Sequence, residues 1–193
     1  MFETDRLFVR LYEPEDGPFV LDMYSRMDVQ RFLGTSPKPM QSIDEATAAI
    51  QRWRSVSDAN PLLGVWAVAQ RSGEPVGTVM LKMAPLSSDQ KPLPLSDDHE
   101  VGWHLHPQYW GHGYATEATS GVLQRAFLAG IQEVVAVILP ANVASKRVAE
   151  RLRMEYLGLT ERYYSAVADL YVARSASQSV AHAGRRAEER SRR

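Results

Sequence analysis

Two closely spaced glycines give this sequence its clearest chemical potential. Gly111 and Gly113 lie in the segment QYWGHGYA (residues 108–115), between a predicted strand and a predicted helix that begins near Tyr114. A glycine-rich turn before a helix leaves backbone N–H groups free to bind an anion, and the helix dipole favours a phosphate there. Glycines can also serve the geometry of a tight turn alone. The segment therefore indicates a phosphate-binding turn, with a purely structural turn as the alternative.

Two well-known phosphate motifs do not fit this segment. A Walker A loop requires Gly-Lys-Ser or Gly-Lys-Thr, which the sequence lacks. A dinucleotide-binding fold requires a third glycine three residues after Gly113, where Thr116 stands. It also requires a helix after its first strand, whereas the strands that precede this turn are joined as hairpins. These two classes of nucleotide-binding protein are therefore excluded.

An acidic residue, Glu100, begins the predicted strand at residues 100–106, which leads into the glycine turn. A carboxylate close to an amine can remove its proton directly or through a water molecule. The same position also suits an ordinary surface glutamate at the end of a strand. Glu100 is therefore a candidate general base, and its surroundings decide between the two interpretations.

Three histidines, His99, His104 and His106, lie on or beside the same strand, and the last two share one of its faces. No cysteine or carboxylate accompanies them at the spacing of a known metal site. We therefore expect no bound metal, and we assign these histidines to the lining of a site or to the surface. The four tryptophans are too dispersed to form a stacking surface for nucleic-acid bases.

The composition is that of a soluble globular protein. The chain has 193 residues, of which 45% are hydrophobic and 23% are charged, and this suits one domain with a substantial core. It has no cysteine, which excludes a thiolate nucleophile, disulfides and a Cys-ligated zinc site. No apolar run is long enough to cross a membrane, and the N-terminal residues do not resemble a signal peptide. We therefore expect a cytoplasmic protein with no membrane partner.

The net charge of −1 is unevenly distributed along the chain. Five arginines and two glutamates give residues 175–193 a charge of +3, which leaves −4 on residues 1–174. A mildly acidic body offers no surface for nucleic acid. The basic tail lacks apolar periodicity, so we expect a flexible extension or a fraying helix beyond a domain of residues 1–174.

Hydrophobic periodicity and turn residues place the elements that carry these side chains. We expect strands at residues 6–11, 63–70, 75–83, 100–106, 132–139, 156–162 and 168–174. We expect helices from residue 14, at 42–56, at 114–129 and at 142–153, and a proline-rich surface loop at 84–97. Hairpins followed by strand–helix–strand–helix units indicate an α/β (or α+β) fold with one mixed, twisted sheet.

Several of these segments together resemble the GCN5-related N-acetyltransferase (GNAT) superfamily. The string EVGWHLHPQYWGHGYATEA at residues 100–118 is similar to its RimJ/RimL-like branch, which acetylates protein N-termini and other amines. Further similar motifs are TDRL (residues 4–7), PVG (residues 75–77) and Asn142-x-x-Ser145-x-x-Val148. The resemblance covers residues 4–174 in matching order. It implies the GNAT-like fold, in which one splayed central sheet of about seven strands has helices on both faces.

The resemblance also implies acetyl-CoA as the cofactor and names the residues that bind it. Backbone N–H groups of the glycine turn would hold the pyrophosphate. The backbone of the preceding strand would bind the pantetheine, which requires that strand to splay from its neighbour. Asn142 and Ser145, three apart on one helix face, would face the pantetheine and the thioester sulfur. The cofactor-binding residues expected in this way are Trp103, His104, Leu105, Gln108, Gly111, His112, Gly113, Tyr114, Ala115, Asn142 and Ser145.

The resemblance further implies two catalytic residues. Glu100 matches the proposed general base of the RimL-like branch, and Ser145 resembles its proposed acid. Many GNAT enzymes instead protonate the leaving thiolate with a tyrosine on the same helix, but that position here is Ala149. Because an alcohol is a poor acid at neutral pH, Ser145 either acts as the acid or only donates a hydrogen bond to the thiolate. Tyr163 and Tyr164, near the last hairpin, are the alternative acids.

The sequence therefore predicts an acetyl-CoA-dependent N-acetyltransferase that acts on a primary amine, such as the N-terminal amine of a protein. Two alternatives remain open. One is an enzyme for a small amine (an amino acid, polyamine or aminoglycoside), and the other is a non-catalytic acyl-CoA-binding sensor. We expect the acceptor pocket between residues 14–56 and the loop at 84–97, which is predicted to border it and to move more than the sheet. Members of this family often dimerise, so a homodimer is a further expectation.

Overall fold

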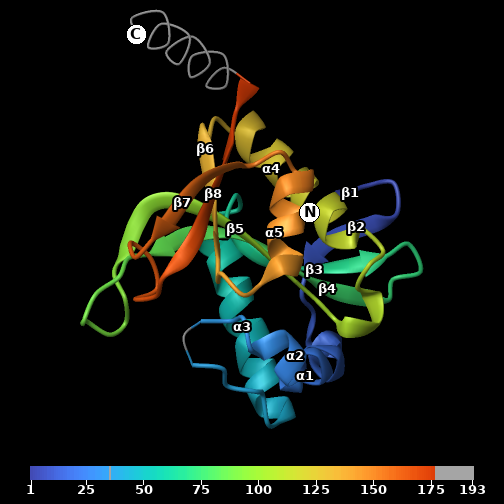
Figure 1. The fold of residues 1–193 in the computed structure, drawn as a ribbon. Coiled ribbons are helices and arrows are strands. Elements are labelled where there is room, and N and C mark those ends of the chain that lie inside the picture. Colours follow the sequence, from blue (N-terminus) through green and yellow to red (C-terminus); the bar gives the residue numbers. More distant parts are fainter. Residues whose placement is uncertain (35, 177–193) are drawn as a thin grey trace, which may run out of the picture.

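A single mixed sheet organises the protein, which is described by a computed structural model of residues 1–34 and 36–176 (Figure 1). The eight strands in this part of the chain are β1 (Phe2–Glu3), β2 (Leu7–Leu11), β3 (Gly64–Gln70), β4 (Pro75–Pro85), β5 (Leu95–Leu105), β6 (Glu133–Ile138), β7 (Glu155–Thr160) and β8 (Ala168–Arg174). Their order is β1-β2-β3-β4-β5-β6-β8-β7, and β5 and β6 are parallel neighbours among otherwise antiparallel ones. The α/β class and the mixed sheet are confirmed. The strand beyond the expected seven arises because residues 2–3 pair with β2.

β5 and β6 are joined over a very short stretch. Within the described residues, their register pairs are His99 with Val134 and Glu100 with Val135. From there β5 continues to Leu105 in register with β4 alone, so its other edge separates from β6. This separation is the predicted splay. It leaves backbone N–H and C=O groups on one edge of β5 that need another partner.

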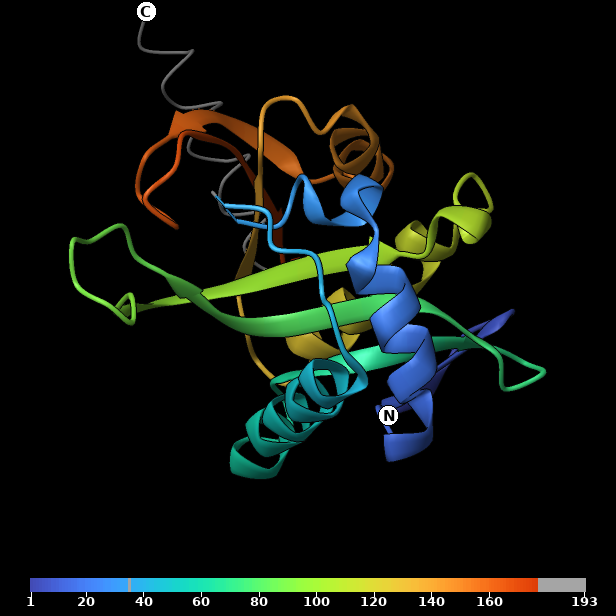
Figure 2. The same ribbon diagram turned by 90° about the horizontal axis from the view of Figure 1, so that it is seen from below.

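Helices lie on both faces of the sheet, as expected. They are α1 (Gly17–Ser25), α2 (Met27–Gln30), α3 (Ile43–Ala59), α4 (Tyr114–Leu128) and α5 (Val143–Arg151), with 3₁₀ turns at Pro14–Asp16 and Pro107–Tyr109. Figures 1 and 2 show α1 to α3 on one side of the central strands and α4 and α5 on the other. Met23 and Ile50 represent the buried apolar cluster under α1 and α3. Val122 and Ala149 join α4 and α5 to the main core on the opposite face.

Local sequence signals explain where three of these helices begin. The Ser42 side chain accepts a hydrogen bond from the Glu45 N–H at 3.2 Å, which is the capping interaction expected for α3. The Asn142 side chain accepts from the Ser145 N–H at 3.1 Å at the start of α5. Gly113 precedes α4 with a φ of +80°, a conformation that glycine adopts without strain.

The loop expected at residues 84–97 is shorter than predicted. β4 extends to Pro85 and β5 begins at Leu95, and these two residues pair with each other. Residues 86–94 therefore form the tip of a long hairpin, which projects from the sheet in Figure 2. The prolines misled the prediction because proline interrupts central strands, whereas here they lie at a strand end or in the tip, where no ladder bond is lost.

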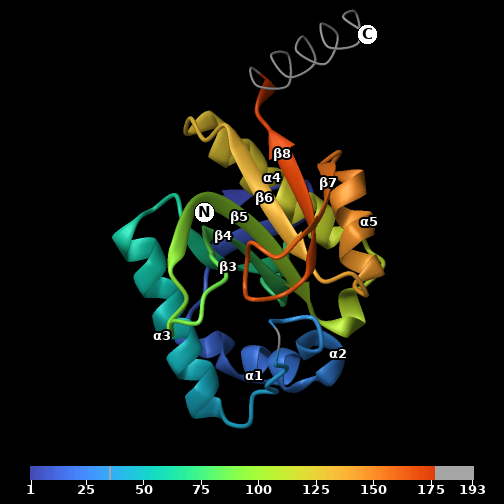
Figure 3. The same cartoon turned by 60° about the vertical axis from the view of Figure 1, so that its left-hand side comes forward.

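This hairpin tip (residues 86–94) docks on the connection between β7 and β8 (residues 161–167). The Ser87 N–H donates to the Arg162 carbonyl at 2.8 Å, and the Ser165 N–H donates to the Ser87 hydroxyl oxygen at 3.0 Å. Figure 3 shows this connection beside β8, which lies between β6 and β7. The tip therefore holds a segment that lies far away in the sequence.

Two further expectations concern the ends of the chain. The helical stretch from residue 14 starts as a 3₁₀ turn and breaks at Arg26, whose extended backbone separates α1 from α2. The predicted basic tail lies, apart from residues 175–176, outside the described residues. None of the helices in the described part of the chain is long and apolar enough to cross a membrane.

Candidate functional site

A large cleft lies where β5 separates from β6. Its walls come from the end of β5, the glycine turn, α4, α5 and the segment around α2. The predicted cofactor-binding residues that line it are Trp103, His104, Leu105, Gly111, His112, Gly113, Ala115, Asn142 and Ser145. Gln108 and Tyr114 lie beside it: the Gln108 N–H donates to His106 Nδ1 at 3.2 Å, and Tyr114 stacks on His112 with ring centroids 5.6 Å apart. The cleft thus brings together two segments predicted to bind the cofactor, residues 103–115 and 142–145.

The glycine turn has the backbone that a phosphate site needs. Gly111 and Gly113 have φ angles of +81° and +80°, in the left-handed region. A Cβ at Gly111 would meet no atom within 4 Å, and a Cβ at Gly113 would meet only the Arg6 guanidinium, at 3.4 Å. The space over both glycines is therefore open to a ligand. The first N–H groups of α4, which lack partners within the helix, begin at the same point.

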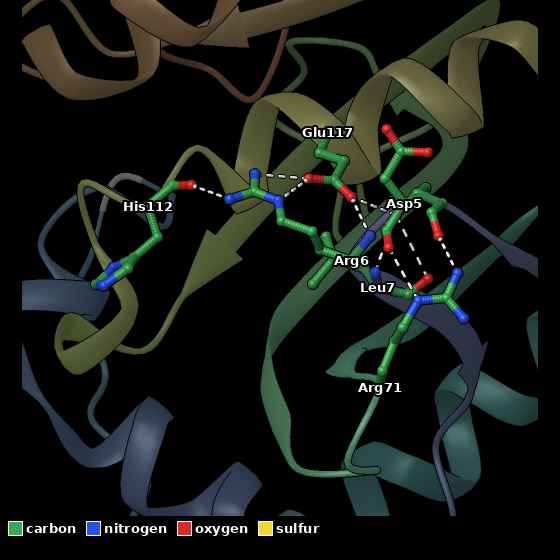
Figure 4. Close-up of polar contacts among 7 residues, drawn as sticks. Asp5, Arg6, Leu7, Arg71, His112 and Glu117 are labelled. Atoms are coloured by element: carbon green, nitrogen blue, oxygen red, sulfur yellow. Dashed lines mark hydrogen bonds and ion pairs between the residues drawn. The ribbon is translucent and has the colours of Figure 1, made fainter.

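Arg6, in the connection between β1 and β2, hydrogen-bonds to this turn (Figure 4). Its Nη1 donates to the His112 carbonyl at 3.0 Å, and its Nε donates to the Glu117 carboxylate at 2.7 Å. Glu117 also accepts from the Thr4 hydroxyl at 2.5 Å and from the Arg6 backbone N–H at 2.9 Å. Burial raises the pKa of Glu117, but these hydrogen bonds outweigh it, and the net pKa is below its ordinary value. Glu117 is therefore held as an anion, and Arg6 supplies the compensating positive charge beside the turn.

Two buried polar atoms in the cleft wall suit a long polar ligand. Trp103 Nε1 and Thr116 Oγ1 have no hydrogen-bond partner within the described residues. Leaving such a buried group unpaired costs about 1–3 kcal/mol. A ligand that carries phosphates and amides would satisfy these atoms, the free edge of β5 and the glycine turn together. The residues present therefore fit acetyl-CoA.

The start of α5 gives Asn142 a structural role and leaves Ser145 free for another. The Asn142 side chain caps the helix, which occupies its carbonyl oxygen. Ser145 lines the cleft and contributes its backbone N–H to this cap, so its hydroxyl is not committed by it. Ala149, at the position where many relatives in this superfamily carry a tyrosine, is fully buried in the main core.

Glu100 lies on the other side of β5 from the main core, in a cluster with Lys82 and Tyr164. It is 4% exposed, so its interpretation as a surface glutamate is wrong. The Tyr164 hydroxyl donates to its carboxylate, and Lys82 Nζ lies 3.8 Å from the same oxygen. Burial raises the pKa of Glu100, and the Lys82 cation and these hydrogen bonds offset the rise only in part. Glu100 is not among the residues that line the cleft.

The hairpin tip holds the tyrosine of this cluster in place. Tyr164 and Ser165 both have left-handed backbones, with φ of +61° and +52°. Such non-glycine residues cost of order 1–3 kcal/mol each and persist where the surrounding structure enforces them. Of the two alternative acids, Tyr164 therefore contacts Glu100, whereas the Tyr163 hydroxyl donates to Asp98 at 2.9 Å.

His104 and His106 face α1, where each has a different partner. His104 Nδ1 lies 3.0 Å from the Tyr24 hydroxyl, and His106 Nε2 lies 3.0 Å from the Asp22 carboxylate. Burial, followed by the nearby Lys82 cation, lowers the pKa of His104 to about 4. No group of three or more His, Cys, Asp or Glu side chains in the described residues is placed to hold a metal ion.

The expected walls of an acceptor pocket border the cleft only in part. Asp28 on α2 and Phe32 just after it line the cleft. Within the described chain, no residue of α3 or of the hairpin tip does so. The hairpin tip instead contacts the segment that carries Tyr164, which hydrogen-bonds to Glu100.

Comparison with known proteins places this geometry in a family. Residues 6–155 match the family described as an acetyltransferase (GNAT) domain. The "uncharacterized N-acetyltransferase YoaA" of Bacillus subtilis (strain 168) is 26% identical over 168 residues, which cover 84% of this chain and 87% of YoaA.

Two solved structures share the fold. RimL, a ribosomal L7/L12 alpha-N-protein acetyltransferase in complex with coenzyme A, is 16% identical, with a TM-score of 0.69 over 89% of this chain and 95% of RimL. The microcin C7 self-immunity acetyltransferase MccE, in complex with acetyl-CoA and AMP, is 13% identical, with a TM-score of 0.70 over 89% of this chain and 94% of MccE.

Proposed function

The chain belongs to the GNAT acetyltransferase family and is an acyltransferase, and from this premise we propose that it transfers the acetyl group of acetyl-CoA to a primary amine, the N-terminal amine of a protein. One observation carries the proposal. The glycine turn at the start of α4 lies beside the free edge of β5, so that phosphate donors and amide-binding groups share one cleft.

Acetyl-CoA supplies an acetyl group activated as a thioester. The backbone N–H groups of residues 111–115 would bind its pyrophosphate, with the positive end of the α4 dipole behind them. The free edge of β5 at residues 103–105 would bind the pantetheine amides. Trp103 Nε1 would gain the partner that it lacks in the described chain.

We propose Glu100 as the general base that removes a proton from the acceptor amine. A raised pKa brings a carboxylate closer to the pKa of its task and lets it take up and release a proton more readily. Because Glu100 lies behind the cleft wall, a bound water would connect it to the amine. Lys82 and Tyr164 hold the carboxylate in one orientation.

We propose Ser145 as the hydrogen-bond donor to the leaving thiolate. It lines the cleft at the first turn of α5, where the helix dipole favours a negative charge. No tyrosine occupies position 149 to supply a proton, so Ser145 stabilises the thiolate by its hydrogen bond and solvent supplies the proton.

The acceptor class is proposed from two observations. The cleft wall around α2 carries both Asp28 and Phe32, which suits the backbone N–H groups and the first side chains of an extended peptide. RimL, a structural neighbour, is an alpha-N-protein acetyltransferase.

The test is an acceptor screen with acetyl-CoA at saturation. The purified chain is mixed with peptides that have free N-termini, with the same peptides after N-terminal blocking, and with amino acids, polyamines and aminoglycosides. Thiol release is followed for each acceptor. We expect transfer to the free peptides alone. Preferred transfer to a small amine would replace the proposed acceptor class, and binding of acetyl-CoA without transfer to any amine would make the chain a sensor.

A further inference from the structure

A chain of buried hydroxyl groups runs from His104 into the protein. The His104 Nδ1 atom lies 3.0 Å from the Tyr24 hydroxyl, which lies 2.9 Å from the Thr78 hydroxyl. The Thr78 hydroxyl lies 2.7 Å from that of Tyr12, whose oxygen is 3.1 Å from the Gly77 carbonyl. Tyr12 and Thr78 are completely buried and Tyr24 is 5% exposed, so water does not enter the chain.

The end of this chain fixes the direction of every hydrogen bond in it. A carbonyl can only accept, so Tyr12 must give its single proton to Gly77. Thr78 must then donate to Tyr12, and Tyr24 must donate to Thr78, because each hydroxyl has one proton to give. Tyr24 can therefore only accept from His104. In the opposite direction, the oxygen of Tyr12 would face the Gly77 carbonyl without a proton between them.

The consequence is a defined tautomer of His104. Its Nδ1 carries the hydrogen, and its Nε2 is left with a free lone pair. Nε2 has no partner in the described residues and is not among their fully buried unpaired polar atoms, and His104 lines the cleft. The lone pair is therefore available to a ligand in the cleft.

The charges around His104 suit a neutral amine. Lys82 on β4 and Glu100 on β5 lie on the same face of the sheet as His104, and Asp98 continues that face two residues before Glu100. From α1, Tyr24 approaches His104 and Asp22 approaches His106. Burial, followed by the Lys82 cation, lowers the pKa of His104 to about 4, so the imidazole is uncharged at neutral pH. A carboxylate in contact with an amine stabilises the ammonium form, which cannot attack a carbonyl. A neutral imidazole nitrogen stabilises the ammonium form much less.

We propose that His104 is a catalytic residue that touches the acceptor amine: its Nε2 accepts a hydrogen bond from an N–H group of the amine and orients the nitrogen lone pair for attack. The inference rests on the proposed function. In this scheme Glu100 removes a proton from the acceptor amine, and His104 holds the amine nitrogen after that proton has left.

The tautomer can be tested without any activity measurement. The protein is labelled with ¹⁵N-histidine, and His104 is assigned by comparison with His104→Gln. We expect two-bond ¹H–¹⁵N spectra at neutral pH to show a protonated Nδ1 and an unprotonated Nε2. Tyr24→Phe removes the acceptor of the Nδ1–H and should give a mixture of tautomers. A hydrogen on Nε2 in the wild-type protein would overturn the inference.

The role is tested by acetyl transfer with variants. His104→Leu should lower kcat/KM for the acceptor at least tenfold and leave the Kd of acetyl-CoA within about twofold of the wild-type value. His104→Gln retains an acceptor atom and should recover part of the loss. His99→Gln, a matched change on the same strand, should have no effect.

Two outcomes separate failure of this inference from failure of the proposed function. If wild-type protein transfers acetyl groups and His104→Leu does so equally well, the inference is wrong and the proposed function stands. If wild-type protein transfers to no amine, the proposed function is wrong, and the role of His104 falls with it, whatever the tautomer.

Discussion

Two glutamates, Glu117 and Glu100, lie on opposite sides of this site and are treated in opposite ways. Glu117 is surrounded by donors from Thr4 and Arg6 that hold it as an anion, and its pKa is below its ordinary value. Glu100 is more deeply buried, and its pKa is above its ordinary value despite the nearby Lys82.

This difference in pKa suits the two carboxylates to different roles. A carboxylate with several donors is a fixed part of the scaffold, because each donor makes its protonation more costly. A buried carboxylate with fewer donors exchanges protons more easily and suits acid–base chemistry. The Glu117 cluster therefore builds the anion site, and the Glu100 cluster performs the proton transfer that we propose.

The largest expected effect is on kcat and follows from a change at Glu100, the proposed general base. Glu100→Gln should lower kcat about 100- to 10,000-fold, the usual contribution of a general base, with little change in acetyl-CoA affinity. The loss should shrink as pH rises, because more of the acceptor amine is then already neutral. Steady-state kinetics from pH 6 to 9 measure this, with Glu133→Gln on β6 as the control. Equal loss at every pH would indicate that Glu100 positions a cationic amine, and retention of more than half the activity would exclude it as the base.

The next effect is on the anion site. Gly113→Ala puts a Cβ on a left-handed residue over the turn, and it should weaken acetyl-CoA binding at least tenfold, about 1.4 kcal/mol, in calorimetry. Gly73→Ala is the matched control, because Gly73 has a φ of +92° in a hairpin turn that does not border the cleft. Both variants should lose similar stability, of order 1–2 kcal/mol. Equal loss of acetyl-CoA affinity in both would refute the assignment of the turn.

A smaller effect separates charge from geometry at Arg6. Arg6→Gln leaves Glu117 uncompensated beside the turn and should weaken acetyl-CoA binding about twofold to fivefold. The double variant Arg6→Gln/Glu117→Gln removes the remaining negative charge and should bind more tightly than Arg6→Gln alone. If the double variant binds no better, Arg6 acts through the position of the His112 carbonyl rather than through charge.

The smallest expected effect is on stability. The contributions of the two glutamates to stability change in opposite directions as pH rises. The raised pKa of Glu100 means that its contribution to stability is fully present below its unfolded pKa, about 4.5, and is lost as pH rises through its folded pKa. The lowered pKa of Glu117 means that its contribution is present above about 4.5 and is lost as pH falls through its folded pKa.

Thermal unfolding of two variants measures this. Relative to the wild-type protein, Glu100→Gln should gain in Tm as pH rises from 4 to 7. Glu117→Gln should have a lower Tm at pH 7, with a difference that shrinks toward pH 4. If the Tm of both variants, relative to the wild-type protein, changed with pH in the same direction, the different roles proposed for the two glutamates would be contradicted.

The sequence predicted those features of the fold that depend on short-range patterns. The glycine turn, the capping of α3 by Ser42 and the order of strands and helices follow from spacings of a few residues. The splay followed from the family resemblance and is confirmed by the register of β5 and β6.

The polar clusters of the site escaped prediction because their members are far apart in the chain. Arg6 and Glu117 are separated by 111 residues, Glu100 and Tyr164 by 64, and Tyr24 and His104 by 80. Both members of the first pair lie within motifs that the resemblance singled out, but nothing in either motif specifies a partner. Only the folded sheet brings them into contact.

The brief union of β5 and β6 has a mechanical consequence. Two ladder positions, at His99 and Glu100, pair β5 with β6 in the described chain, so a change in the angle between these two strands would turn about them. The proposed base thus sits on the hinge line, where displacement is smallest, and the cleft opens toward Leu105, where it is largest. A wedge of this kind can widen to admit a bulky ligand while the backbone of Glu100, behind the cleft wall, stays in register.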